Sequence, residues 1–276
     1  MKRHSLKLQC LPNARRAPTP NQTRVTFLTG NEYWWQTIWC AQTLLFHAQT
    51  PLRLEIVDDG SLPRAKAAEM LRLFPHAEFL GSSEVTHKLA KKISPSTHPL
   101  IWHYREVKPI FRKLPDIFGR DDEWRMLLDS DMLFFSRPEA LLNWLETPAQ
   151  PAYMVDVKNA YGYSPEIMQS LSGGANPEKV NIGMFGFKGE LVDWDRLETW
   201  IETLVTKEGL RYNLTQALSA MHLVGNPCTV FPAEDYLLLP TADQAQTPEQ
   251  PLQHYVAESK EAYFRFGWRA AAKALA

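Results

Sequence analysis

Short apolar runs of β-forming residues alternate with longer helical patterns over the first half of the chain. The runs at 25–28 and 52–57 end in small or acidic residues, and large side chains recur at helical spacing after the first of them. Pro63 follows the second run, and proline is well tolerated in the first turn of a helix. This alternation predicts an α/β fold with a mostly parallel sheet flanked by helices.

The second half of the chain continues the alternation. We expect strands at 124–128, 132–135, 153–157 and 182–187, and helices at 102–115, at 194–205, at 212–222 and near the C-terminus. Residues 241–251 are polar and include two prolines, so we predict a loop there. The chain has no internal repeat, and its 276 residues suit a single domain with two lobes.

Positive charge is concentrated at the N-terminus. The first 24 residues include six basic residues and no acidic one, whereas the whole chain has a net charge of −1, so the remainder is mildly acidic. We predict a basic arm over 1–22, solvated or in contact with anionic lipid or a partner, and a folded body over 23–276. A nucleic-acid-binding protein would carry basic residues across its folded body, so we expect no nucleic-acid partner.

The chain shows no signal for export or for membrane insertion. No apolar run reaches the roughly 18 residues of a spanning helix, and the basic N-terminus lacks the apolar segment of a secretory signal. The three cysteines, Cys10, Cys40 and Cys228, form no CxxC pair and suit reduced thiols. We therefore expect a soluble, cytoplasmic protein with no transmembrane segment.

Acidic residues stand at or near the ends of three predicted strands. Asp58 and Asp59 follow the second strand, Asp129 and Asp131 follow the strand at 124–128, and Asp156 lies near the end of the strand at 153–157. In an open α/β sheet, ligands bind at the carboxyl ends of the strands. We therefore expect the functional site at this edge of the sheet.

Asp129 and Asp131 are separated by Ser130 and lie between two apolar runs. Residues i and i+2 of an extended chain point to the same side, so the two carboxylates converge. Carboxylates this close repel each other unless a cation lies between them or one is protonated, and hard oxygen ligands favour Mg²⁺ or Mn²⁺ over zinc. The pair predicts a divalent-cation site, and the alternative is a polar turn in a β-hairpin.

The sequence around this pair, LLDSDMLFFSRP, resembles the DxD motif of GT-A-fold glycosyltransferases, and other segments resemble the same fold in the same order. IVDDGS is similar to its nucleotide-contacting acidic segment. YMVDV and VNIGMFGF resemble the Asp and the N-x-G strand of retaining family 8 transferases, and HYVAESK resembles their C-terminal His-to-Lys segment. NLTQAL resembles their D-Q-D-x-L-N helix, but only Gln216 of its D-Q-D triplet is retained.

The resemblance covers residues 24–268 and implies a GT-A (Rossmann-like) domain, with a nucleotide-binding half at 23–135 and an acceptor-binding half at 136–276. It implies a hexosyltransferase-like enzyme that moves a sugar from a nucleotide-diphosphate sugar, with uridine diphosphate expected, to a hydroxyl of a saccharide, lipid-linked or protein acceptor, with retention. It also implies Mn²⁺ or Mg²⁺ held by Asp129, Asp131 and His254.

The same resemblance, together with the strand-end positions, identifies further candidates. The expected donor-binding residues are Thr29, Asp58, Asp59, Lys113, Asp129, Ser130, Asp131 and Lys260. The expected catalytic residues are Gln216, Asp156 and Asn181, and Gly183 would allow the sugar to approach the backbone. Asp156, Glu234 and Asp235 are alternative bases if the reaction inverts.

Several candidates also suit purely structural roles. Asp58 is a good residue to cap a turn, His254 on its own suits a structural histidine, and Lys113 and Arg105 suit solvated surface charge as well as phosphate contact. Asn181 suits an amide at the edge of the core.

Tyr161 and Tyr163 suit either the core or a loop that contacts the acceptor.

Other enzyme classes fit less well. A haloacid-dehalogenase-like phosphohydrolase has Thr or Val where this chain has Leu133, and a nucleotidyltransferase would need a glycine-rich phosphate loop that is missing here. A non-catalytic sugar-nucleotide-binding relative and an inverting family 2 type transferase remain as alternatives. The chain lacks the Q-x-x-R-W segment of processive family 2 polymerases and retains every expected metal ligand.

Overall fold

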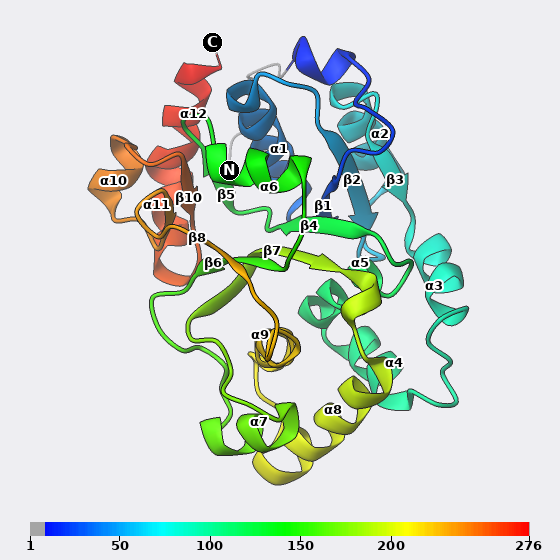
Figure 1. The fold of residues 1–276 in the computed structure, drawn as a ribbon. Coiled ribbons are helices and arrows are strands. Elements are labelled where there is room, and N and C mark those ends of the chain that lie inside the picture. The colour runs from blue at the N-terminus through cyan, green and yellow to red at the C-terminus, as the bar shows by residue number, and fades with distance from the viewer. Residues whose placement is uncertain (1–8, 276) are drawn as a thin grey trace.

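The computed structural model describes residues 9–275, which form two sheets with helices around them (Figure 1). The strands are β1 (Arg24–Thr29), β2 (Arg53–Asp58), β3 (Glu78–Leu80), β4 (Trp124–Leu128), β5 (Met132–Phe134), β6 (Ala152–Val155), β7 (Val180–Lys188), β8 (Thr229–Phe231), β9 (Tyr236–Leu238) and β10 (Leu252–His254). Seven of them form a sheet in the order β3-β2-β1-β4-β7-β6-β8, and β5-β10-β9 form a smaller one.

The helices lie between these strands along the chain. They are α1 (Trp34–Ala48), α2 (Arg64–Leu73), α3 (Ser82–Ala90), α4 (Pro99–Val107), α5 (Pro115–Phe118), α6 (Glu139–Glu146), α7 (Pro165–Ser172), α8 (Trp194–Glu208), α9 (Leu214–His222), α10 (Ala242–Gln246), α11 (Lys260–Ala262) and α12 (Trp268–Ala274). Short turns of helix include η1 (Asn13–Arg15), η2 (Pro109–Lys113) and η5 (Tyr263–Gly267), of which η5 is π-helical.

The direction of β7 decides which strand ends meet. Strands β3, β2, β1 and β4 pair in parallel, whereas β7 runs antiparallel between β4 and β6. The carboxyl ends of β4 and β6 therefore lie at the same edge of the sheet as the beginning of β7. This edge brings together the acidic residues that the sequence places after β4 and β6.

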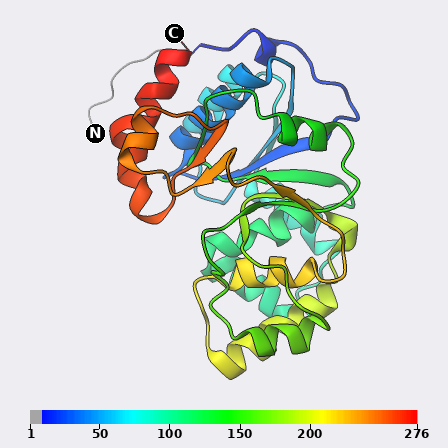
Figure 2. The ribbon, with the colours of Figure 1, turned by 60° about the vertical axis from the view of Figure 1, so that its left-hand side comes forward.

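Helices cover both faces of the large sheet, as the sequence predicts. In Figure 1, α1, α6 and α12 lie above the sheet, and α4, α7, α8 and α9 lie below it. Figure 2 shows the same two layers, with α7 and α8, in green and yellow, furthest from the sheet. Each layer has its own buried apolar cluster, because the strands carry apolar side chains on both faces.

Most of the predicted elements are present, and the differences have local causes. The helix predicted at 102–115 is divided at Pro109, because the residue before a proline is disfavoured in helical conformation and Lys108 is extended. Residues 241–251 are not entirely a loop, since they contain α10. Thr241 begins that helix with a capping box to Gln244. Strand β3 was not predicted at all.

Part of the predicted N-terminal arm packs on the folded body. Ala14 of η1 is buried, and the side-chain amide of Asn13 donates to the carbonyl of Leu45 in α1 (2.5 Å). The side chain of Gln42 donates to the carbonyl of Gln9 (3.1 Å). Three of the basic residues that define the arm, Lys2, Arg3 and Lys7, lie outside the described residues. None of the helices over 9–275 has the length and apolar character needed to cross a bilayer.

A buried ion network joins the amino-terminal ends of the central strands. Glu55 of β2 is fully buried and accepts hydrogen bonds from Arg120 (2.6 Å), Arg125 (3.3 Å) and Thr26 (2.9 Å). Burial alone would raise the pKa of Glu55, but the two guanidinium groups outweigh it and lower the pKa. The carboxylate thus neutralises the buried guanidinium group of Arg120, which has no other ion-pair partner among the described residues, whereas Arg125 also pairs with Asp121.

We predict that Glu55→Ala destabilises the protein by about 3–5 kcal/mol, because it leaves buried arginine charge unpaired. Urea unfolding would measure this loss. Glu69→Ala, which removes an exposed carboxylate paired with Arg72 on α2, should change stability by no more than about 1 kcal/mol. Equal losses in the two variants would contradict the assignment.

The same network gives a pH dependence with a defined sign. The folded-state pKa of Glu55 lies below its unfolded value of about 4.3, so its stabilisation is present above that pH and is lost as the pH falls through the folded pKa. Acid unfolding of Glu55→Ala should therefore be less steep than that of the natural chain.

Candidate active site

The predicted metal-binding pair lies in a short loop between β4 and β5. The backbone N–H of Asp129 donates to the carbonyl of Gly183 in β7 (2.7 Å), and the N–H of Tyr255 donates to the carbonyl of Asp131 (2.9 Å). Buried apolar residues, Leu128 and Met132, stand on either side of the loop. The loop is held at both ends, which fixes where the two carboxylates point.

His254 completes a cluster with these carboxylates. Strand β10 pairs antiparallel with β5 and places His254 opposite Met132, next to the loop. Its Nε2 atom lies 3.1 Å from Oδ1 of Asp131 and 3.8 Å from Oδ2 of Asp129. One ligand atom from each of the three residues lies within 4.8 Å of the others.

This donor set fits a divalent cation. Two carboxylates and one imidazole nitrogen suit Mn²⁺ or Mg²⁺ better than a soft metal. His254 is only 1% exposed, and its other nitrogen, Nδ1, has no hydrogen-bond partner among the described residues. The ring directs Nε2 at the two carboxylates.

Two lysines add positive charge to the cluster. The ammonium group of Lys113 lies 2.5 Å from Oδ1 of Asp129, and that of Lys260 lies 3.8 Å from Oδ2 of Asp131. Burial raises the pKa of Asp131, but the hydrogen bond from His254 and the charges of His254, Lys260 and Lys113 outweigh it and lower the pKa below its usual range. Asp131 is therefore held in its ionised form.

A second polar cluster contains the three predicted catalytic residues. Asp156 directly follows β6, Asn181 lies on β7 and Gln216 lies on α9. The side-chain amides of Asn181 and Gln216 both donate to Oδ2 of Asp156, at 2.9 and 3.2 Å. Asn181 and Asp156 are more than nine-tenths buried. The structure thus brings together residues that are 60 positions apart in the chain.

Gly183 joins the two clusters. Its N–H donates to Oδ1 of Asn181 (2.8 Å), and its carbonyl accepts the hydrogen bond from Asp129. A Cβ atom at this position would lie 2.2 Å from Cε1 of His254, closer than real Cβ contacts occur. Glycine is required because the backbone of β7 lies directly against the imidazole ring.

Hydroxyl groups connect the loop between β4 and β5 to the end of β1 and the first turn of α1. Thr37 of α1 donates to Oγ1 of Thr29 at the end of β1 (2.7 Å) and shares a hydrogen bond with Ser130 (2.8 Å). Thr37 was not identified from the sequence. Its position one turn into α1, on the face that points at the strand ends, is the only signal that would have suggested it.

The turn after β2 lies beside the turn after β1. Oδ1 of Asp58 accepts hydrogen bonds from the N–H groups of Gly60 (2.8 Å) and Leu62 (3.0 Å), which is the turn-capping role. The carboxylate of Asp59 lies against Gly30, where a Cβ atom would be 2.2 Å from its oxygens. Asp58 therefore caps its turn with one oxygen, while Oδ2 has no hydrogen bond among the described residues.

Three other candidates lie in the core. Arg105 forms a buried ion pair with Asp116, so it is neither solvated nor directed at the metal-binding loop. Tyr161 donates to the carbonyl of Pro177, and burial raises its pKa to about 12. Tyr163 accepts a hydrogen bond from the backbone of Arg211 (3.2 Å). Both tyrosines belong to a buried apolar cluster, which agrees with the first of the two expectations for them.

The alternative bases Glu234 and Asp235 stand before β9. Strand β9 runs parallel to β10, with Leu238 opposite His254. The two acids therefore lie three or more residues before that level, roughly 10 Å away along the strand. Their position does not support the idea that this segment folds over the site.

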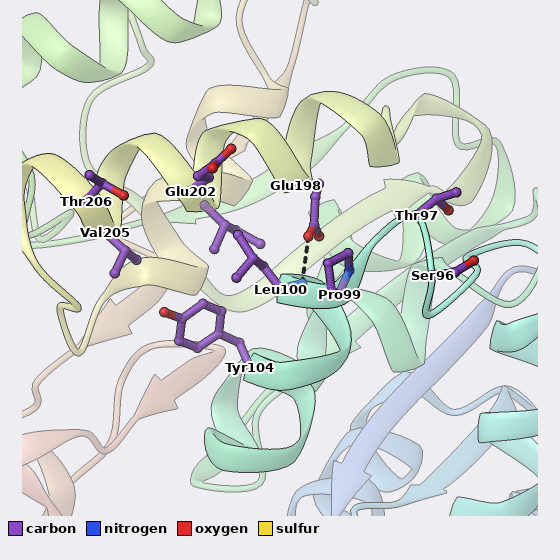
Figure 3. A pocket seen from close by; sticks show the side chains of 10 residues that line it. Ser96, Thr97, Pro99, Leu100, Tyr104, Glu198, Glu202, Val205 and Thr206 are labelled. Carbon is purple, nitrogen blue, oxygen red and sulfur yellow. Dashed lines mark hydrogen bonds between the residues drawn. The ribbon is translucent and has the colours of Figure 1, made fainter.

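A cavity of about 630 Å³ lies away from these clusters, between α4 and α8 (Figure 3). On its wall, Glu198 of α8 accepts hydrogen bonds from the backbone N–H groups of Leu100 (2.6 Å) and Ile101 (2.9 Å). None of the predicted site residues lines it. The carboxylate ties the start of α4 to α8, which is a structural role.

We predict that the chain binds Mn²⁺ through the cluster of Asp129, Asp131 and His254, and that Asp131→Asn weakens this binding at least tenfold, because a neutral amide replaces a charged ligand. Electron paramagnetic resonance of free Mn²⁺ would measure the affinity. Asp122→Asn is the matched control, since Asp122 is exposed and precedes the opposite end of β4. Equal Mn²⁺ binding by all three forms would exclude the site.

Comparisons with known proteins place the chain by its fold. No sequence-family description and no curated protein matches it. Similar solved structures are the bifunctional glycosyltransferase WbbM (TM-score 0.56, 13% identity, 94% of this chain and 53% of that one) and the galactosyltransferase LgtC in complex with donor and acceptor sugar analogues (0.57, 13%, 91% and 96%). Mouse xyloside xylosyltransferase 1 is similar as well (0.55, 13%, 84% and 97%). This chain spans about half of the WbbM chain. The likeness confirms the GT-A fold that the sequence resemblance predicts.

Proposed function

We propose that the protein is a metal-dependent glycosyltransferase that moves a sugar from a nucleotide-diphosphate sugar, with uridine diphosphate preferred, to an acceptor hydroxyl with retention of configuration. One observation carries the proposal: the carboxylate–imidazole cluster and the Asp156–Asn181–Gln216 cluster are joined through Gly183 at one edge of the sheet. A cation site beside a set of fixed amides and a carboxylate suits a sugar linked to a diphosphate.

The similar structures support a sugar-transfer reaction. All three are named as glycosyltransferases, and one contains analogues of both a donor and an acceptor sugar. Another LgtC structure is of an active-site variant in which a glutamine is replaced by glutamate. The present chain has a glutamine, Gln216, in its candidate site.

The positive groups of the site suit the departing diphosphate. Asp129, Asp131 and His254 would hold a divalent cation, which supplies a Lewis acid for the negative charge on the leaving group. The ammonium groups of Lys113 and Lys260 lie beside the same carboxylates and would bind phosphate oxygens. On the nucleotide side, Oδ2 of Asp58 would accept the uracil N–H.

Among the described residues, none of the three candidate bases, Asp156, Glu234 and Asp235, is well placed to act as the base of an inverting reaction. Oδ2 of Asp156 already accepts two amide hydrogen bonds, and Oδ1 faces the N–H of Lys158 at 3.4 Å. Glu234 and Asp235 precede β9, at the end of that strand far from His254. The arrangement therefore favours a mechanism that needs no protein base.

In that mechanism the bond between the anomeric carbon and the phosphate oxygen breaks, and its electron pair leaves with the diphosphate. The acceptor hydroxyl forms the new bond on the same face of the sugar and gives its proton to a departing phosphate oxygen. Asp156 and Asn181 would hold the sugar, and the carbonyl of Gln216 would stabilise positive charge on its opposite face.

We predict that the protein releases nucleoside diphosphate when it is incubated with a uridine-diphosphate sugar and Mn²⁺, and that excess EDTA stops the release. Asp131→Asn should lower turnover by about a hundredfold or more with an unchanged melting temperature, and Asp122→Asn should not. A panel of nucleotide sugars would identify the donor, and stronger binding of guanosine diphosphate in calorimetry would contradict the uridine preference. Binding without release would instead indicate a non-catalytic relative.

We predict that an α-linked donor gives an α-linked product. Proton NMR of the first product, recorded before any anomeric equilibration, reads the configuration directly. Gln216→Ala should slow the reaction without changing the configuration, because Gln216 stabilises charge and takes no proton. A β-linked product would refute retention and support an inverting transferase.

A further inference from the structure

Lys113 binds the same carboxylate that the site offers to a metal ion. Its ammonium group lies 2.5 Å from Oδ1 of Asp129, and its side chain is only 13% exposed. A lysine at this distance is a competitor for the carboxylate, because an ammonium group and a divalent cation both require its negative charge. A role in phosphate binding alone would not explain why Lys113 pairs with Asp129.

The main chain at Lys113 is fixed, so only the side chain can change partners. Phe111 and Leu114, on either side of Lys113, are buried in the core. The next turn is tied down by Asp116, which is fully buried and pairs with Arg105 and with Arg112 (3.1 Å). Lysine has a flexible four-carbon side chain that carries a point charge, so its ammonium group can move while its backbone stays in place.

The charges around the loop determine when the ammonium group of Lys113 can leave Asp129. Asp129 and Asp131 contribute two negative charges, which Lys113 and Lys260 balance. A divalent cation alone would leave two excess positive charges in a partly buried site. A nucleoside diphosphate brings enough negative charge to balance the cation and to receive the ammonium group of Lys113.

We propose that Lys113 competes with the divalent cation for Asp129 and thereby makes the cation and the nucleoside diphosphate bind cooperatively. The cation binds weakly while Lys113 holds the carboxylate, and it binds tightly once the diphosphate has drawn the ammonium group away. By reciprocity, the cation strengthens diphosphate binding by the same factor. This inference rests on the metal site of the proposed function but not on sugar transfer.

The experiment measures Mn²⁺ affinity by electron paramagnetic resonance of free Mn²⁺, with and without uridine diphosphate, in the 276-residue chain. Lys113→Met should bind Mn²⁺ alone about tenfold more tightly than the natural chain, which corresponds to about 1.4 kcal/mol. Uridine diphosphate should raise the Mn²⁺ affinity of the natural chain by a larger factor than that of Lys113→Met.

Three further variants test whether the charge of Lys113, rather than a structural role, sets the Mn²⁺ affinity. Lys113→Arg keeps the charge and should retain the weak Mn²⁺ binding of the natural chain. Lys92→Met removes the same charge at the other end of β4, where Lys92 pairs with Asp122, and should leave Mn²⁺ affinity unchanged. Lys260→Met should have a smaller effect than Lys113→Met, because Lys260 lies 3.8 Å from its carboxylate and is nearly half exposed.

The possible results distinguish this inference from the proposed function. Equal or weaker Mn²⁺ binding by Lys113→Met, with binding to the natural chain intact, would overturn the competition and leave the metal site standing. No Mn²⁺ binding by any form, even with uridine diphosphate, would overturn both. Cooperative binding without release of nucleoside diphosphate from any nucleotide sugar would overturn only the transferase proposal.

Discussion

The close contact between the backbone of Gly183 and the ring of His254 is the constraint on which the candidate site depends. Strand β7 runs between β4 and β6, and Gly183 is the residue at which its backbone bonds to Asp129 and to Asn181. Any side chain at this position would collide with the imidazole ring. The absence of a side chain therefore lets the groups of two clusters meet across one strand.

Buried charges are balanced differently at the two ends of the central strands. At the amino-terminal end, Glu55 is buried and paired with arginines from inside the protein, so the charges are balanced permanently. At the carboxyl end, Asp129 and Asp131 are balanced by lysines whose side chains can move. A permanent balance stabilises the fold, whereas a movable one leaves the acids free to exchange partners with a ligand.

The sequence predicted what depends on local pattern and missed what depends on long-range pairing. The apolar runs before Asp58 and Asp129 were identified as strands because each is a continuous buried segment, but β3 is three residues long and only partly buried. His254 and Lys260 were proposed only from the family resemblance, since no local rule predicts that β10 pairs with β5, which precedes it by more than 110 residues. Thr37 gave only a weak signal, its position one turn into α1, because a single threonine in an apolar helix is common.

The same contrast applies to residues whose neighbours decide their role. Tyr161 and Tyr163 were left between core and acceptor contacts, and the structure buries both, because their hydroxyl groups find backbone partners inside the fold. The sequence suited Arg105 to a phosphate contact or to surface charge. The structure shows neither role, because Arg105 pairs with the buried Asp116. In each case the role of the residue depends on a hydrogen-bond or ion-pair partner elsewhere in the chain, and the local sequence does not predict that partner.

The hydrogen bonds of the Asp156–Asn181–Gln216 cluster leave one acceptor atom without a partner among the described residues. Asn181 donates its amide to Asp156 and accepts from Gly183, so both ends of that side chain are used. Gln216 donates to the same carboxylate, and no hydrogen bond among the described residues involves its carbonyl oxygen. Because the N–H side of the amide is fixed toward Asp156, the carbonyl side must point elsewhere. Under the proposed function, this atom is therefore the group of the cluster best suited to face a positively charged sugar.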